Sequence, residues 1–126
     1  MRALQIIRSA YRCTIEEQDD PALWIARAMK GAGASLAVLL RGNAVGYAVE
    51  GQDATGLSIG TRAQTRPPSL DQDINALIGG GTDVYVVAED ADERGIDVLG
   101  FAPGVKTIPR HELPRLFAEF DQVWHW

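Results

Sequence analysis

The chain has 126 residues, 46% of them hydrophobic, and carries 12 basic against 17 acidic side chains for a net charge of −5 at pH 7. This size fits one compact domain, residues 1–126, and the negative balance excludes a broad cationic face for nucleic acid or anionic lipid. The first residues have too short an apolar stretch for a signal peptide, and no run approaches a membrane span, so we expect a cytoplasmic protein.

The first half of the chain predicts a strand, a helix and a second strand. The opening strand is expected at residues 4–7. After a polar loop, a helix over 21–31 begins with a proline, which suits a first turn, and Asp19 or Asp20 can cap it. Residues 35–40 are mostly apolar, which is typical of a parallel strand covered on both faces. Helices are therefore expected on both sides of a sheet.

The middle of the chain predicts two helices around an irregular stretch. Asn43 is a good N-cap for a short helix over 44–49. Residues 51–69 contain three glycines and two prolines, which interrupt regular structure repeatedly and predict a surface or interface loop. The next helix starts at Ser69 or Asp71 and ends at three consecutive glycines.

Three further strands are expected, at residues 84–87, 105–108 and 122–126. The last two flank a helix over 109–120, in which Pro114 still falls within the first turn. Five strands alternating with helices predict the α/β class, as a three-layer α/β/α sandwich around a mostly parallel five-stranded sheet.

The last residues hold two tryptophans at alternate positions, Trp124 and Trp126. Alternate residues of a strand share one face. The two indoles can pack against a helix of the same chain, or they can anchor a subunit interface, where aromatic residues are enriched.

Ligands of open parallel sheets bind beyond the carboxyl ends of the strands. The loops expected there are residues 9–20, 41–43 and 88–95. Arg41 could pair an anion there, and the helix terminus at Asn43 could add N–H donors. The candidates for a ligand pocket at this edge are Arg41, Asn43, Glu89 and Asp90.

Cys13 is the single cysteine and the one candidate for a catalytic nucleophile. A chain with one cysteine cannot form an internal disulfide, and it cannot build a metal site from several of its own thiolates. Arg12, or Arg41 if the loops meet, would favour its thiolate, whereas Glu16 and Glu17 would oppose it.

Other kinds of chemistry have weaker support in the sequence. His111 and His125 fall near the start of the last helix and in the terminal strand, where structural or interfacial roles are expected. The acidic residues at 89–93 could coordinate a hard cation in a small hydrolase or metal enzyme, but they lack the spacing of a calcium loop and are better explained as a solvated turn. No glycine-rich phosphate loop occurs, and neither a metal nor a cofactor is expected.

Three segments and their order resemble the DsrE-like family of small sulfur-relay proteins, which includes DsrE-type and TusD-type subunits. They are residues 39–45, residues 84–96, which end in Arg94-Gly95-Ile96, and residues 113–126. The resemblance covers essentially the whole chain. It implies a three-layer α/β/α domain that assembles as homo- or hetero-oligomers, commonly trimers or hexamers, with persulfide sulfur carried on a cysteine in active members.

In members that have this cysteine it stands at the position of Val87, sometimes with a second cysteine at that of Asp90. Valine cannot ionise or form a persulfide, so sulfur transfer at that position is excluded here. The resemblance then favours a non-catalytic oligomeric subunit that binds a small ligand or a partner, such as a related DsrE-like subunit or a sulfur-carrier protein. The alternative is a persulfide carrier that uses Cys13.

Overall fold

The computed structural model describes residues 1–10, 20–53 and 55–126. Its main sheet has five strands, and all four pairings between them are parallel. In their order across the sheet the strands are β6 (Lys106–Ile108), β5 (Val84–Val87), β2 (Ser35–Leu40), β1 (Arg2–Ile7) and β7 (Gln122–His125). This confirms the predicted α/β class and its mostly parallel sheet.

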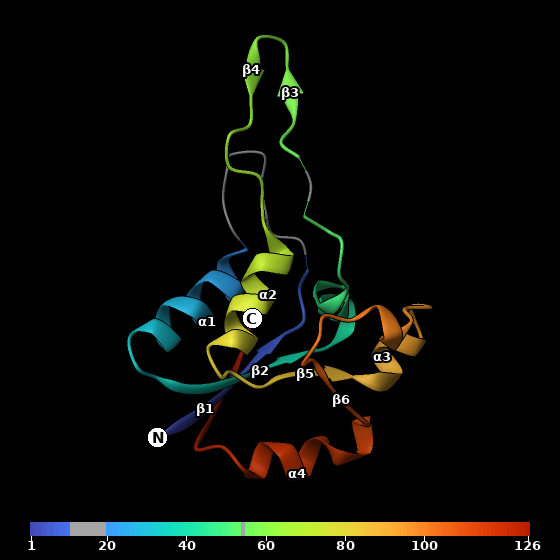
Figure 1. Cartoon of the computed structure of the whole chain (residues 1–126). Coiled ribbons are helices and arrows are strands. Elements are labelled where there is room, and N and C mark those ends of the chain that lie inside the picture. The colour runs from blue at the N-terminus through green and yellow to red at the C-terminus, as the bar shows by residue number, and fades with distance from the viewer. Residues whose placement is uncertain (11–19, 54) are drawn as a thin grey trace.

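Helices cover both faces of this sheet (Figure 1). On one side lie α1 (Pro21–Gly31), α2 (Leu70–Gly79) and the 3₁₀ helix η1 (Gly42–Ala48), and on the other lies α4 (Leu113–Ala118). The shorter elements are α3 (Ala88–Asp92), η2 (Val98–Gly100), η3 (Arg110–Glu112) and the hairpin β3 (Ser58–Ile59) with β4 (Arg62–Ala63). No helix in the described residues is long and apolar enough to cross a membrane.

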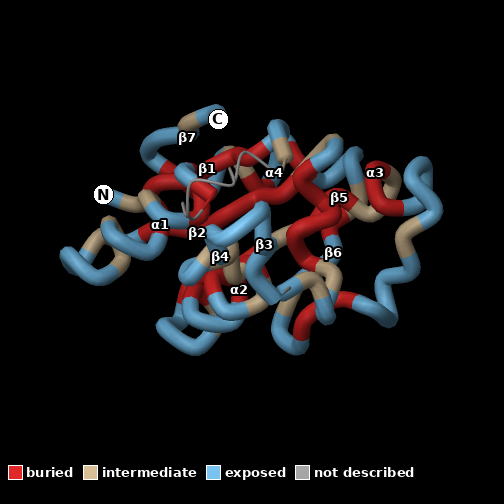
Figure 2. Tube along the Cα trace, turned by 90° about the horizontal axis from the view of Figure 1, so that it is seen from above, coloured by how far each residue is buried: buried red, intermediate tan, exposed pale blue. Residues whose placement is uncertain are grey.

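The sheet separates two hydrophobic cores because successive side chains of a strand point to opposite faces. In β2, Val38 and Leu40 belong to the core under α1 and α2, whereas Leu39 belongs to the core over α4, and all three are fully buried. Figure 2 shows the buried residues concentrated along the sheet and the inner sides of the helices. The central strands are thus covered on both faces, as their apolar run predicts.

Asp20 begins α1, as one of the two residues predicted to cap it. Its carboxylate accepts hydrogen bonds from the backbone N–H groups of Ala22 (3.0 Å) and Leu23 (3.2 Å), and the hydroxyl of Tyr47 donates to its other oxygen. Asp20 is 1% exposed. One buried carboxylate therefore closes the start of α1 and connects it to η1.

Two predicted helix starts differ in the structure. The helix after β2 is 3₁₀ and begins at Gly42, with Arg41 as its N-cap residue, so Asn43 does not cap it. Ser69 precedes α2 without a side-chain cap. Asp53 takes that role, because its carboxylate accepts from the N–H groups of Asp71 (2.8 Å) and Gln72 (3.3 Å).

Three further segments correct the predicted pattern. The stretch 51–69 is not wholly irregular, since it contains the β3–β4 hairpin, and the expected acidic turn is the short helix α3. The expected helix over 109–120 divides into η3 and α4. Of the two C-terminal indoles, Trp124 packs against the α1–α2 core, whereas Trp126 is 43% exposed.

Replacing Asp20 by alanine tests the cap of α1. The variant loses two backbone bonds at the helix start and the bond from Tyr47, so we expect the free energy of unfolding to fall by about 2 kcal/mol. Urea denaturation measures this change. Asp92→Ala, at an exposed position of α3, is the control, and an equal loss in both variants would contradict the assignment.

Candidate functional site

The carboxyl ends of three neighbouring strands meet at one edge of the sheet. β2 ends at Leu40, β5 at Val87 and β6 at Ile108, and the register pairs Leu40 with Val86 and Val87 with Ile108. The chain continues from these ends into η1, α3 and η3. Residues that are remote in sequence are therefore brought side by side, as expected for a ligand site of a parallel sheet.

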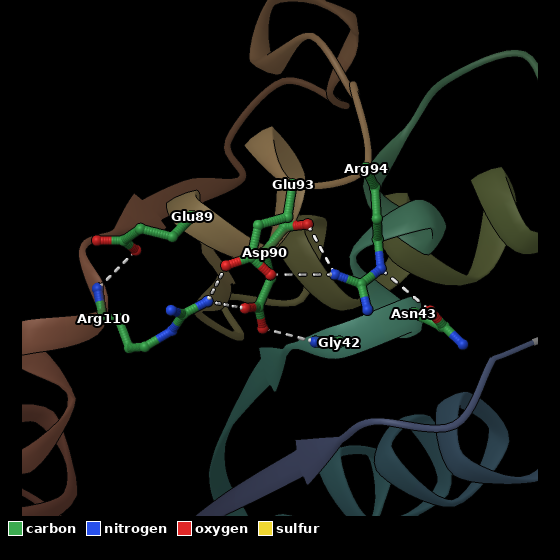
Figure 3. Close-up of polar contacts among 7 residues, drawn as sticks. All are labelled: Gly42, Asn43, Glu89, Asp90, Glu93, Arg94 and Arg110. Atoms are coloured by element: carbon green, nitrogen blue, oxygen red, sulfur yellow. Dashed lines mark hydrogen bonds and ion pairs between the residues drawn. The ribbon is translucent and has the colours of Figure 1, made fainter.

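Asp90 lies at the centre of this edge (Figure 3). It is 6% exposed, and its two carboxylate oxygens accept from the Gly42 N–H (2.7 Å) and from the Arg110 guanidinium (2.5 Å). Burial by itself would raise the pKa of Asp90, but these two donors outweigh it and hold the pKa below its ordinary value. Asp90 is thus a fixed, ionised carboxylate.

Arg110 connects the start of η3 to the acidic helix α3. Its guanidinium also donates to Glu93 (3.0 Å), and its backbone N–H donates to Glu89 (2.7 Å). Backbone N–H groups, those of Glu89 itself and of Arg110, lower the pKa of Glu89. The hydrogen bonds to Asp90 and Glu93 raise the pKa of Arg110. These three acidic side chains are already paired, and the described residues contain no group of three or more metal-ligating side chains arranged around a cation.

Arg94 connects α3 to η1. Its Nε donates to the Asn43 side-chain oxygen (3.0 Å), and one terminal nitrogen donates to the Asp90 carbonyl (3.0 Å). Asn43 therefore faces Arg94, and the first N–H groups of η1 are occupied, because Gly42 donates to Asp90 and Ala44 to the Arg41 carbonyl (3.2 Å). The predicted N–H donors at this helix start are used within the chain.

Arg41 makes no hydrogen bond or ion pair with this network, although its charge helps to lower the pKa of Asp90, and it lies beside Arg8. The register pairs Ile7 with Leu40, so the two arginines follow the ends of neighbouring strands, and the Arg41 N–H donates to the Ile7 carbonyl (3.0 Å). Arg8 is exposed and Arg41 half-buried. Within residues 1–10, 20–53 and 55–126, neither guanidinium has a hydrogen-bond or ion-pair partner. Two adjacent cations thus remain available at the carboxyl ends of β1 and β2.

The predicted site residues separate into three groups. Asn43, Glu89 and Asp90 share one network, Arg41 stands apart from it, and Cys13 lies outside the described residues, as do Arg12, Glu16 and Glu17. Arg94 belongs to the loop of residues 88–95 predicted at this edge, but it was not among the chosen candidates. Sequence reasoning missed Arg110, although Arg110 follows the end of a predicted strand and so belongs to the same edge. Val87 is 0% exposed and belongs to the α4-side core.

A separate open groove of about 290 Å³ is lined by residues of β5, β6, η3 and α4. Its lining includes Tyr85, Lys106 and Arg115. Lys106 is already ion-paired with Asp83 at 2.7 Å, and burial raises the pKa of Tyr85. The ion pair likewise raises the pKa of Lys106, so both Tyr85 and Lys106 are shifted away from neutrality.

The comparisons with known proteins support the fold. No family model matches the chain, and no curated protein matches it in sequence. Among solved structures, the Escherichia coli ychN protein superposes with a TM-score of 0.75 at 21% identity, covering 100% of both chains. BT1422 from Bacteroides thetaiotaomicron, of unknown function, gives 0.66 at 12% identity, covering 98% of this chain and 94% of its own. MTH1491 from Methanobacterium thermoautotrophicum, also of unknown function, gives 0.60 at 12%, covering 98% and 97%. At these identities the likeness establishes a shared fold.

The network around Asp90 predicts a pH-dependent loss of stability in Arg110→Met. This variant leaves a buried carboxylate without its ion-pair partner, so we expect the free energy of unfolding at neutral pH to fall, and only modestly because Arg110 is half-exposed. The pKa values of Asp90 and Glu89 are lower in the folded state than in the unfolded state. The two carboxylates therefore stabilise the fold fully at pH above the ordinary carboxyl pKa, and this stabilisation is lost as the pH falls through their folded-state pKa values.

The difference between wild type and Arg110→Met should therefore narrow on acidification, which urea denaturation at several pH values measures. Arg115→Met is the matched control, since this exposed arginine has no ion pair in the described part of the chain. A difference that stays constant with pH would contradict the role of Asp90.

Proposed function

We propose that this chain is a cytoplasmic, non-catalytic subunit of a DsrE-like oligomer, and that it binds a small oxyanion, or an anionic group of a partner, at the carboxyl ends of β1 and β2. A trimer or hexamer of this chain, or a complex with a related DsrE-like subunit or a sulfur-carrier protein, is the expected assembly. The observation that carries the proposal concerns the end of β5, where the family resemblance implies a reactive thiol and this chain has none. Val87 is buried there, and Asp90 is ion-paired.

The carboxylates at this edge are poor acid–base catalysts. An efficient general acid or base has a pKa near the working pH. The pKa values of Asp90 and Glu89 are shifted away from neutrality, and both side chains accept hydrogen bonds from Arg110. Their contacts are those of a structural connection between α3 and η3, which favours binding or assembly over catalysis.

The two available guanidinium groups favour an anionic ligand. Arginine presents several N–H donors in a planar arrangement that matches sulfate, phosphate or carboxylate oxygens. Arg8 and Arg41 extend from adjacent strand ends, so one oxyanion could contact both. The structure thus supports an anion site beside the Asp90 network, since Asp90 is already neutralised by Arg110.

Arg41→Ala tests this anion site. Isothermal titration with thiosulfate, sulfate and phosphate should show binding to wild type and a loss of at least about tenfold in affinity in the variant, because a charge-assisted hydrogen bond is removed. Arg115→Ala is the control at an exposed arginine elsewhere. Equal affinities in wild type and Arg41→Ala for every anion would remove the site.

Intact-mass measurement after incubation with thiosulfate or with a cysteine desulfurase separates the proposed subunit from a persulfide carrier. We expect neither wild type nor Cys13→Ala to gain mass. A gain of about 32 Da in wild type that disappears in Cys13→Ala would make Cys13 a sulfur carrier, since the chain has no other thiol.

A further inference from the structure

The β3–β4 hairpin forms an arm, defined here as residues 55–66. Figure 1 shows it projecting away from the sheet, beyond α1 and α2. Its strands pair antiparallel through Ser58 with Ala63 and Ile59 with Arg62, and a two-residue loop joins them. An isolated two-stranded hairpin is marginally stable in water. An arm of this kind gains stability when another surface covers it.

The base of the arm is attached firmly to the rest of the chain. The carboxylate of Asp53 accepts from the Asp71 and Gln72 N–H groups, and that of Asp71 accepts from the N–H groups of Gly51 (2.7 Å) and Gln52 (3.2 Å). These reciprocal bonds join the segment before the arm to the start of α2. The direction in which the arm leaves the globule is therefore set by backbone contacts.

The arm exposes an apolar face with a cation on it. Leu57 and Ile59 are 55% and 65% exposed, and because they alternate along the strand they share one face. Arg62 pairs directly across from Ile59, so it lies on that face too, and it has no ion-pair partner among the described residues. This face has the composition of an interface: large apolar side chains with an arginine.

The charge of the arm is opposite to that of the rest of the chain. The arm contains two arginines and no acidic residue, whereas the remaining residues carry ten basic against 17 acidic side chains, a net charge of −7. A second copy of this chain is therefore an electrostatically complementary partner for the arm.

The same chain exposes a matching surface in the turn of residues 97–99. Val98 and Leu99 are 46% and 89% exposed, and Asp97 precedes them. Two hydrogen bonds position this turn: the Glu50 N–H donates to the Gly100 carbonyl (3.0 Å), and the Leu99 N–H donates to the Asp97 side-chain carboxylate (2.9 Å). The two apolar side chains therefore make no evident contribution to the core, which favours an intermolecular role.

We propose that the arm of one copy docks on the 97–99 turn of a second copy. Leu57 and Ile59 pack against Val98 and Leu99, while Arg62 faces Asp97. Within one copy the arm lies apart from the connection between α3 and β6 in both views, so the contact forms between copies (Figures 1 and 2). The inference rests on the proposed function in one respect, namely that the chain works as an oligomer.

Such a contact joins two different surfaces, so it closes into a ring when the rotation between copies allows. The area that one hairpin face can bury is small compared with the roughly 800 Å² that each partner buries in a stable interface. In a ring each copy both supplies an arm and receives one, and the two contacts add to the area that each copy buries.

Sedimentation velocity of the full chain over a wide range of concentration tests the contact. We expect wild type to be oligomeric and both Ile59→Glu and Leu99→Glu to weaken association at least about tenfold. Trp24→Glu is the control, because Trp24 is 55% exposed on α1, an element that belongs to neither surface, and should leave association unchanged. Thermal melting checks that each variant remains folded.

A charge exchange tests the pairing of the two surfaces. Arg62→Glu and Asp97→Arg should each weaken association, and the double variant should recover it, because each arm then meets a turn of opposite charge. In the sedimentation experiment, an Ile59→Glu variant that still forms the oligomer would overturn the docking of the arm and leave the proposed oligomer intact. Loss of association in Ile59→Glu but not in Leu99→Glu would overturn the 97–99 turn as the receiving surface. A wild type that is monomeric at every concentration would overturn the oligomer and the docking together, while the titrations with anions decide the ligand site separately.

Discussion

One buried carboxylate that requires compensating donors determines the contacts at the carboxyl ends of β2, β5 and β6. Asp90 follows the end of β5 and is 6% exposed, so its charge is costly without partners. Its partners come from the ends of the two neighbouring strands, the Gly42 N–H after β2 and Arg110 after β6. One side chain thereby holds together three segments that are separated by about twenty or more residues in the chain. The parallel sheet makes this possible, because it brings every carboxyl end to the same edge.

The same network determines what chemistry this edge can support. In the family that the sequence resembles, reactivity would come from a thiol at the position of Val87, with a second thiol in some members at that of Asp90. Here the first position contributes to the α4-side core and the second to ion pairs. The carboxylates of this edge are therefore occupied by structural contacts, and the guanidinium groups of the edge that have no hydrogen bond or ion pair within the described residues are those of Arg8 and Arg41. This arrangement favours recognition of an anion over covalent transfer.

The proposed contact of the arm and the proposed anion site involve different residues of the molecule. The globule is held by two apolar cores on either side of the sheet, whereas the arm presents Leu57 and Ile59 to solvent. A surface of this kind is unusual for a monomer, which is why we propose that a second copy covers it. The chain shares its fold with the ychN protein at 21% identity, and a shared fold does not by itself fix the function.

The sequence by itself determined the elements whose signals are local. The continuous apolar run of β2, the cap at Asp20 and the alternation of strands and helices predicted the sheet, α1 and the fold class correctly. Local pattern could not distinguish the 3₁₀ form of η1 from an α-helix, nor could it reveal a hairpin with strands of two residues in a stretch rich in glycine and proline.

For the candidate site, the sequence predicted that four residues follow the carboxyl ends of the strands, where the structure has them, but it did not predict their partners. The pairing of Asp90 with Arg110, of Asn43 with Arg94 and of Asp53 with α2 was decided by the tertiary structure alone. The physical reason is that hydrophobic periodicity records which face of an element is buried. The choice of partner for a charged side chain depends on which segments the sheet order brings together.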